Sequence, residues 1–190
     1  MQQVIVQKFG GTSVGSGERI AAVAEIIKNE AEMNTVVVVV SAMAGETDRL
    51  IELSKLFGDN PNKREFDALI STGEKVSASL LAMALNSLGL KAKSYSAAQV
   101  SLKTTSNFSK AKILDIDKAK MEEILADGSI PIITGFQGIT ETGEVTTLGR
   151  GGSDTTAVAI AASIKANRCD IYTDVEGIYT TDPRIVPNAK

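Results

Sequence analysis

The chain has 190 residues, 43% of them hydrophobic, and carries a formal charge of -3 at pH 7 with one cysteine and no histidine. This length and apolar content suffice for one domain with a substantial core, and the negative charge argues against a broad nucleic-acid-binding surface. Because histidine is absent and Cys169 stands alone, a Cys/His zinc site and a nucleophile–histidine pair are both excluded within one chain, so any chemistry must rest on lysine, arginine, carboxylates and backbone amides.

Short β-branched segments alternate with longer segments of helical period, which is typical of βα units around a parallel sheet. The first expected strand covers 4–7, and apolar residues at i, i+3, i+4 and i+7 over 20–27 predict the first helix. The next strand, 36–40, consists of five valines, so both of its faces should be covered, as in the centre of a helix-flanked sheet. The predicted class is therefore α/β.

The rest of the chain continues this alternation. A long helix is expected from 64 to 88, with Gly89 as its stop, and Gly73 interrupts the helical pattern. Ser153 and Asp154 are good N-cap residues for an alanine-rich helix. The further expected elements are strands at 92–96, 130–134 and 168–173, helices at 118–126 and 155–166, and a polar loop at 104–109.

The turn after the first strand reads Lys8-Phe9-Gly10-Gly11-Thr12-Ser13. Its first glycine begins a P-loop spacing, but Ser16-Gly17 replaces the required lysine and hydroxyl residue, and a dinucleotide-binding motif would need glycine in place of Thr12. One cation, two glycines and two hydroxyl residues before a helix still supply the parts of a phosphate cradle. An ordinary βα turn with a solvated lysine explains this segment alone about equally well.

A second glycine-rich segment, Gly149-Arg150-Gly151-Gly152-Ser153-Asp154, lies at an expected helix start. Arginine binds a carboxylate through two hydrogen bonds, and Asp154 could either cap helix amides or bind a ligand ammonium group. Capping alone accounts for Asp154 equally well. Three glycines beside an arginine, however, exceed what a structural turn requires. The two turns together favour a site for a small anionic molecule.

Five segments in order resemble motifs of the aspartate kinases, within the amino acid kinase family. The segments are Lys8-Phe9-Gly10-Gly11-Thr12-Ser13, Val40-Ser41-Ala42-Met43, Ser71-Thr72-Gly73-Glu74, Leu148-Gly149-Arg150-Gly151-Gly152-Ser153-Asp154 and Thr173-Asp174-Val175-Glu176-Gly177-Ile178-Tyr179-Thr180-Thr181-Asp182-Pro183-Arg184. The resemblance implies a three-layer α/β/α sandwich with a mainly parallel central sheet. It also implies transfer of the ATP γ-phosphate to the β-carboxylate of L-aspartate, the first step of lysine, threonine and methionine biosynthesis.

The resemblance implies catalytic roles for Lys8 and Asp154. Lys8 would neutralise charge on the transferring phosphoryl group, while Asp154 would orient rather than accept a proton, because the acceptor carboxylate is already ionised at neutral pH. The residues implied to bind ATP are Lys8, Phe9, Gly10, Gly11, Thr12, Ser13, Thr173, Asp174, Tyr179 and Arg184. The residues implied to bind the substrate are Ser41, Thr47, Glu74, Arg150 and Asp154.

Within that substrate set, Glu74 and Asp154 would hold an ammonium group and Arg150 a carboxylate. Gly73 would then allow a ligand or another backbone segment to approach beside Glu74, although a simple helix break also explains it. Mg²⁺ is expected with ATP, held mainly by phosphates and water rather than by a protein metal site.

Chains of the resembled family continue beyond position 190. We therefore expect residues 1–190 to be an amino acid kinase catalytic domain truncated at its C-terminal end, without regulatory ACT domains, and poorly active in isolation. The expected partners are ATP and L-aspartate, with no nucleic acid and no membrane, and the parent protein is expected to be a homo-oligomer. No segment approaches the roughly 20 apolar residues of a membrane span, and the N-terminus lacks a signal-like region, so a cytoplasmic location is expected.

Other interpretations stay open. A relative with the same fold, such as acetylglutamate kinase, glutamate 5-kinase or uridylate kinase, is one of them, although the segment 150–154 favours aspartate. A non-catalytic nucleotide-binding or dinucleotide-binding module would explain the glycine-rich turns alone. A subunit that contributes only an assembly surface is a third possibility.

Overall fold

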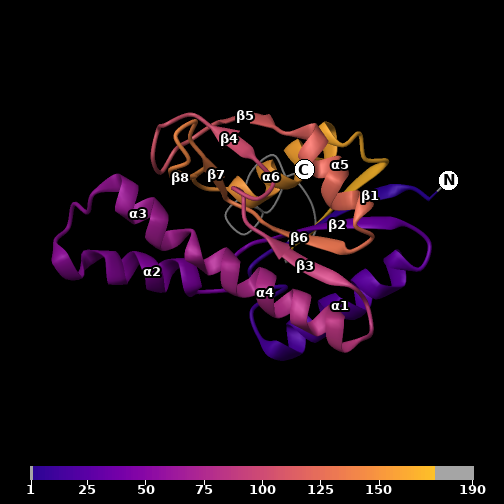
Figure 1. The fold of residues 1–190 in the computed structure, drawn as a ribbon. Coiled ribbons are helices and arrows are strands. Elements are labelled where there is room, and N and C mark those ends of the chain that lie inside the picture. Colours follow the sequence, from indigo (N-terminus) through magenta and orange to yellow (C-terminus); the bar gives the residue numbers. More distant parts are fainter. Residues whose placement is uncertain (1, 174–190) are drawn as a thin grey trace, which may run out of the picture.

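Five parallel strands, in the order β3-β6-β2-β1-β9, form the central sheet within residues 2–173, the part of the chain that the computed structural model describes (Figure 1). The strands are β1 (Val4–Phe9), β2 (Thr35–Val40), β3 (Ala92–Tyr95), β6 (Ile130–Thr134) and β9 (Arg168–Tyr172). Phe9 at the end of β1 lies beside Val40 of β2, which lies beside Thr134 of β6. Three strands thus end level with one another, and the loops that follow them meet at one edge of the sheet.

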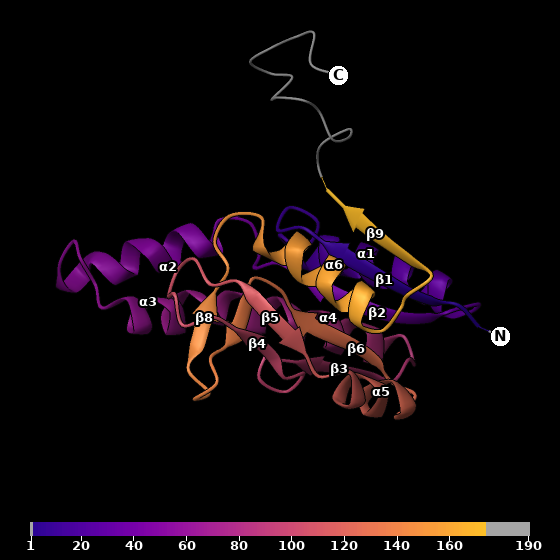
Figure 2. The same cartoon turned by 90° about the horizontal axis from the view of Figure 1, so that it is seen from above.

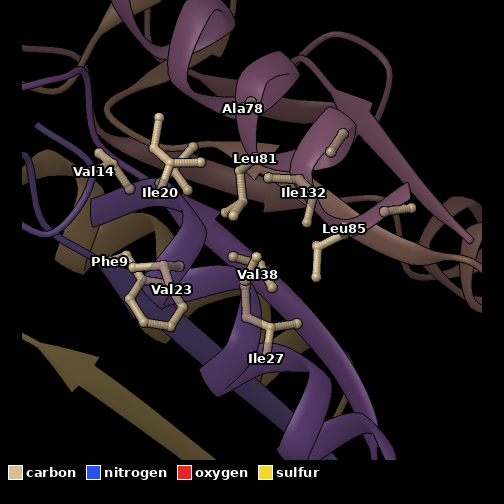
Figure 3. Packing of buried hydrophobic residues seen from close by; sticks show 14 of the residues in the cluster. Phe9, Val14, Ile20, Val23, Ile27, Val38, Ala78, Leu81, Leu85 and Ile132 are labelled. Carbon is tan, nitrogen blue, oxygen red and sulfur yellow. The ribbon is translucent and has the colours of Figure 1, made fainter. Parts of the chain in front are cut away.

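One face of the sheet is covered by α1 (Gly17–Ala31) and α4 (Thr72–Ser87). The Ser16 hydroxyl caps α1 by accepting a hydrogen bond from the Arg19 amide at 3.3 Å. The apolar face predicted for α1 is confirmed, since its buried residues are Ile20, Val23, Ala24 and Ile27. Figure 3 shows how side chains from α1, α4 and the sheet gather into one packed layer. Burial of each large side chain there contributes about 1.5–3 kcal/mol.

The opposite face is covered by α5 (Lys118–Ala126) and α6 (Gly152–Ser163), which completes a three-layer α/β/α sandwich (Figure 2). The predicted burial of β2 on both sides is confirmed. Val38 belongs to the core beneath α1 and α4, whereas Val37 and Val39 belong to the core beneath α5 and α6. A strand with two covered faces has no position for a polar residue, which explains its run of valines.

A second, smaller sheet lies beside this sandwich and is not predicted by the sequence pattern. It has the order β5-β4-β7-β8, with β4 (Leu102–Thr104), β5 (Ile113–Ile116), β7 (Gln137–Ile139) and β8 (Val145–Thr147). Strands of three or four residues are too short to display an alternating pattern. The expected polar loop therefore begins only after Thr104.

The helix expected from 64 to 88 is divided into α3 (Lys63–Ile70) and α4. Together with α2 (Glu46–Ser54) and the short 3₁₀ helix η1 (Lys55–Phe57), α3 projects beyond the sheet as a helical arm (Figure 1). By length and composition alone, Lys63–Ser87 could cross a membrane, with a window mean hydropathy of 1.2, but half of that window is buried inside the fold. It is thus weak evidence for a membrane span, because core helices have the same character.

Candidate active site

A cavity of about 350 Å³ opens at the carboxyl edge of the central sheet. Its wall is formed by the loops after β1 and β2, the starts of α2 and α4, the turn between β6 and β7, and the segment between β8 and α6. Of the residues expected at the site, those that line it are Lys8, Gly11, Ser41, Thr47, Glu74, Arg150 and Asp154. Open parallel sheets bind their ligands at this edge. Sequence reasoning missed Phe136 and Ser153 in the lining, because neither carries a charge that marks it.

An ion pair joins Lys8 and Asp154 in this cavity, with 2.7 Å between Nζ and Oδ1. The Lys8 side chain is only 9% exposed, whereas that of Asp154 is 47% exposed. Solvent screens a half-exposed pair, so the contact contributes little stability. Its consequence is geometric: Asp154 holds the ammonium group of Lys8 at one end of the cavity.

The helix that carries Asp154 begins earlier than predicted. Gly151, in the left-handed conformation with φ 75°, is the N-cap, and α6 starts at Gly152. The expectation that Ser153 and Asp154 cap this helix is therefore wrong; both lie in its first turn. The turn is made by glycine backbone, which leaves the Asp154 carboxylate free to pair with Lys8. The helix also ends at Ser163 rather than at position 166.

Glu74 supplies a buried carboxylate at the other side of the cavity and is 3% exposed. Its Oε1 accepts a hydrogen bond from the Ala42 amide at 3.1 Å, and its Oε2 has no hydrogen-bond partner among the described residues. Burial raises the pKa of Glu74 to about 7, although the bond from Ala42 acts in the opposite direction. A buried carboxylate with one unpaired oxygen is suited to a ligand ammonium group, which would favour the ionised form.

Two glycines fix the position of the loop between β2 and α2. A Cβ atom added to Gly73 would lie 2.8 Å from the Ala42 Cβ, and one added to Gly11 would lie 2.8 Å from the Ala42 carbonyl oxygen. Ser77 secures the same loop by donating a hydrogen bond from Oγ to the Ser41 carbonyl at 2.7 Å. The neighbour beside Gly73 is thus the Ala42 side chain rather than backbone, and Gly73 also stands just after the break between α3 and α4.

Arg150 is exposed, lines the cavity, and forms no ion pair with any residue in the range 2–173. Its guanidinium group is therefore available to a ligand. A backbone hydrogen bond anchors the segment that carries Arg150, because the Leu148 amide donates to the Phe136 carbonyl at 2.8 Å. The site thus presents the buried carboxyl group of Glu74, the exposed guanidinium group of Arg150, and the ammonium group of Lys8, which Asp154 holds in place.

The glycine turn after β1 offers fewer free amides than its sequence suggests. The Gly10 amide donates to the Tyr172 carbonyl at 3.2 Å, and the Ser13 amide donates to the Gly10 carbonyl at 3.0 Å. The amides of Gly11 and Thr12 donate no hydrogen bond to the described part of the chain. These two are therefore the donors that an anion could use. Thr12 and Ser13 themselves lie next to the cavity lining rather than in it.

The side chain of Phe9 belongs to the core. It is 1% exposed and stacks on Tyr172, with 4.5 Å between the ring centroids and 14° between the ring planes. The Phe9 side chain is therefore not placed for the expected contact with ATP, and its carbonyl oxygen already accepts a hydrogen bond from the Ser41 amide at 3.1 Å. Thr173 follows β9 directly and is exposed at the same edge of the sheet. The other expected ATP contacts, Asp174, Tyr179 and Arg184, lie outside the described residues.

Within residues 2–173, no group of three or more His, Cys, Asp or Glu side chains is arranged to hold a metal ion. Asp154, the carboxylate beside Lys8, is already paired.

Comparison with known proteins places these features in context. A sequence profile described as the amino acid kinase family matches residues 3–190. An aspartate kinase of Pseudomonas putida is 56% identical over 188 residues, which cover 98% of this chain and 46% of that protein. The chain therefore spans about half the length of the curated relatives it matches.

Solved structures give the same picture. The aspartate kinase from Synechocystis has a TM-score of 0.82 at 50% identity, with 98% of this chain and 31% of that chain covered. E. coli aspartokinase III, determined in complex with aspartate and ADP, has a TM-score of 0.82 at 29% identity, with coverage of 99% and 53%.

Proposed function

The chain belongs to the amino acid kinase family, and on that basis we propose that it carries the substrate site of an aspartate kinase, which transfers the γ-phosphate of ATP to the β-carboxylate of L-aspartate to give 4-phospho-L-aspartate. The observation that carries this proposal is the single cavity in which Glu74, Arg150 and the Lys8–Asp154 pair converge. Its charges complement an amino acid with two carboxylates. The names of the relatives agree with this substrate.

Each charged group of the substrate has a matching group in the cavity. The buried Glu74 carboxylate would receive the α-ammonium group, and Arg150 would bind a carboxylate through two hydrogen bonds. Ser41 and Thr47 add hydroxyl groups to the same wall. The β-carboxylate would then point towards Lys8. Charge balance inside a low-dielectric cavity selects a zwitterionic diacid over an uncharged ligand.

Phosphoryl transfer to a carboxylate requires positioning and charge neutralisation more than proton transfer. The acceptor is ionised at neutral pH, because its reference pKa is about 3.9, so the reaction needs no general base. Lys8 would stabilise the negative charge on the transferring group, and Asp154 would keep its ammonium group in place. This division of roles is consistent with a chain that contains no histidine.

ATP would enter from the β9 side of the sheet, with its phosphates near the Gly11 and Thr12 amides. Mg²⁺ would arrive with the nucleotide and keep mainly phosphate and water ligands. Thr173, Asp174, Tyr179 and Arg184 are the proposed contacts to the rest of the nucleotide. They follow the strand that pairs with β1.

The proposal extends to the whole protein. Its curated relatives are about twice as long as this chain, which supports a catalytic domain completed, and joined to ACT domains, by further sequence. We propose a cytoplasmic homo-oligomer that supplies the first intermediate of lysine, threonine and methionine biosynthesis. Its small-molecule partners would be ATP and L-aspartate.

The test is formation of an acyl phosphate by the full-length gene product. Hydroxylamine traps such a product as a hydroxamate, so ATP-dependent hydroxamate formation is measured with L-aspartate, L-glutamate and N-acetyl-L-glutamate in parallel, and uridylate phosphorylation is followed separately. We expect L-aspartate to give the highest kcat/KM. Preferential turnover of any of the other three acceptors would overturn the assignment.

A further inference from the structure

Asp67 of α3 is a buried carboxylate that lies outside the cavity. It is 0% exposed, and no lysine or arginine pairs with it within residues 2–173. A buried, unpaired charge costs several kcal/mol unless hydrogen bonds satisfy it. Asp67 accepts four such bonds, two from Ser109 and two from Thr147. Burial of this carboxylate is costly, which suggests that the contacts it makes have a function.

The four bonds join three segments that are distant in sequence. Oδ2 of Asp67 accepts from the Ser109 and Thr147 amides, each at 2.8 Å. Oδ1 accepts from the Ser109 hydroxyl at 2.9 Å and the Thr147 hydroxyl at 3.0 Å. Each oxygen therefore accepts two hydrogen bonds, and the two backbone amides on Oδ2 are donors of fixed direction. A carboxylate satisfies all four as an acceptor, and its charge strengthens each bond.

The residues that Asp67 holds border the segment that carries Arg150. Thr147 is the last residue of β8, three positions before Arg150. Ser109 adopts a positive φ of 66°, and its carbonyl oxygen lies 3.4 Å from the position of a Cβ added to Gly149. Asp67 therefore fixes both the start of the Arg150 segment and the loop that packs against it.

Asp67 is also fixed relative to Glu74. The two residues lie seven positions apart on α3 and α4, which follow each other with only Ser71 between them. The junction is tied to the smaller sheet, because Gln137 Nε2 donates to the Ser71 carbonyl at 2.8 Å. A rigid path thus runs from Glu74 through Asp67 to the segment of Arg150.

We propose that Asp67 is a positioning residue that sets the separation between Glu74 and Arg150, and so the length of the acidic amino acid that the site accepts. This inference rests on the proposed function, in which Glu74 binds the ammonium group and Arg150 a carboxylate. A fixed separation distinguishes aspartate from glutamate, whose side chain is one methylene longer. Small displacements of a positioning group have large effects on binding and turnover.

The test compares Asp67→Asn with wild type in the full-length gene product. Asparagine has the same shape, but its NH2 group would face the Ser109 and Thr147 hydroxyls, which must reverse and accept, and all four bonds lose the negative charge that strengthens them. We expect the KM for L-aspartate to rise roughly tenfold or more, while the KM for ATP changes less than about twofold. The preference for aspartate over glutamate in kcat/KM should fall. A purely structural role would not separate the two KM values.

Variants at Thr147 keep the test decisive if Asp67→Asn folds poorly. Thr147→Val removes the hydroxyl donor and should raise the KM for L-aspartate, whereas Thr147→Ser keeps the donor and should stay near wild type. Asn86→Ala is the matched control. It removes two comparable hydrogen bonds, at 3.1 and 3.0 Å, between the last turn of α4 and Ala92 at the start of β3, neither of which lines the cavity there. It should lower stability without changing the KM for aspartate.

Equal effects of Asp67→Asn and Asn86→Ala on the KM for L-aspartate would overturn the proposal. Hydrogen exchange of the amides at 147–151 gives a readout that needs no turnover. Asp67→Asn should accelerate it and Asn86→Ala should not; unchanged exchange in Asp67→Asn also overturns the proposal. If the wild-type protein phosphorylates no amino acid, the proposed function fails instead, and the exchange result alone decides whether Asp67 positions the Arg150 segment.

Discussion

Glu74 has a pKa of about 7 because it is buried, so its charge changes within the physiological pH range. An ammonium group binds to its ionised form. Below pH 7, binding of L-aspartate must first displace a proton, so we expect affinity to fall roughly fivefold between pH 7 and pH 6 and to level off above pH 8. Isothermal titration calorimetry at several pH values measures this dependence.

The same titration predicts proton release. At pH 7, L-aspartate binding should lower the pKa of Glu74 and release a fraction of a proton, detected as a binding enthalpy that differs between phosphate and Tris buffers. Glu74→Gln should remove both effects and bind aspartate weakly. An affinity that is constant from pH 5.5 to pH 8 in the wild-type protein would contradict the role given to Glu74.

Lys8 is the second residue whose role can be tested individually. Lys8→Ala removes the cation that would neutralise the transferring phosphoryl group, and we expect kcat to fall by roughly 10²–10³, the usual effect of deleting one preorganised donor. Unfolding free energy should change by less than about 1 kcal/mol from loss of the ion pair, because Asp154 is half exposed. Hydroxamate formation and urea denaturation give the two quantities.

A matched control for this variant is Lys91→Ala. Lys91 pairs with Asp127 at 3.3 Å, just before β3 and outside the cavity lining. It should leave kcat near wild type. Retention of more than about a third of wild-type kcat by Lys8→Ala would show that Lys8 has no catalytic role, since a positioned charge contributes far more than threefold.

At the scale of elements, the join between α3 and α4 shows how packing overrides helix propensity. Alanine is preferred over glycine in a helix by about 1 kcal/mol. At Gly73, however, a Cβ would lie 2.8 Å from the Ala42 Cβ, so Gly73→Ala must displace the loop that carries Ser41. We expect a net loss of about 1–3 kcal/mol in unfolding free energy and a raised KM for L-aspartate.

Gly17→Ala provides the comparison. Gly17 is the first residue of α1, and a Cβ there would meet nothing within 4 Å. The substitution should stabilise the protein by about 0.4–1 kcal/mol, because it restricts the unfolded chain without a clash. Chemical denaturation of both variants measures the two changes in unfolding free energy. Equal stabilisation by the two alanines would mean that the contact with Ala42 does not constrain Gly73.

The elements that the sequence predicts are those with a core-facing pattern. The valine run of β2 and the buried face of α1 are read directly, because their neighbours cover them completely. By contrast, α2 buries only Leu50, so its apolar residues do not mark a face covered by the core. The strands of the smaller sheet are likewise too short for a pattern.

The residues of the candidate site also differ in whether the sequence marks them. Glycine-rich turns and isolated charges mark Lys8, Glu74 and Arg150, which line one cavity. The sequence offers no such signal for Asp67, because its hydrogen-bond partners lie 42 and 80 positions away. Long-range positioning contacts leave no local pattern, and they emerge only when the chain is folded.

At the scale of the whole molecule, the two halves of the proposed site differ in how far the described chain completes them. Among the described residues, those that line the substrate cavity lie between positions 8 and 154. The nucleotide side lies next to β9, which pairs only with β1 and forms an edge of the sheet among the described residues (Figure 2). Most of the expected nucleotide contacts follow that strand. Aspartate binding and ATP binding should therefore depend differently on the rest of the protein.

This asymmetry predicts the behaviour of residues 1–190 expressed alone. The isolated chain should bind L-aspartate measurably by calorimetry, because it contains Glu74, Arg150 and the Lys8–Asp154 pair of that cavity. It should bind MgATP weakly and form aspartyl hydroxamate at less than about 1% of the rate of the full-length gene product, since loss of positioning for one substrate costs at least two orders of magnitude. Glu74→Gln in the isolated chain is the control and should abolish the aspartate signal. Turnover equal to that of the full-length protein would mean that the nucleotide site is already complete within these residues, and would contradict the proposed division of the site at β9.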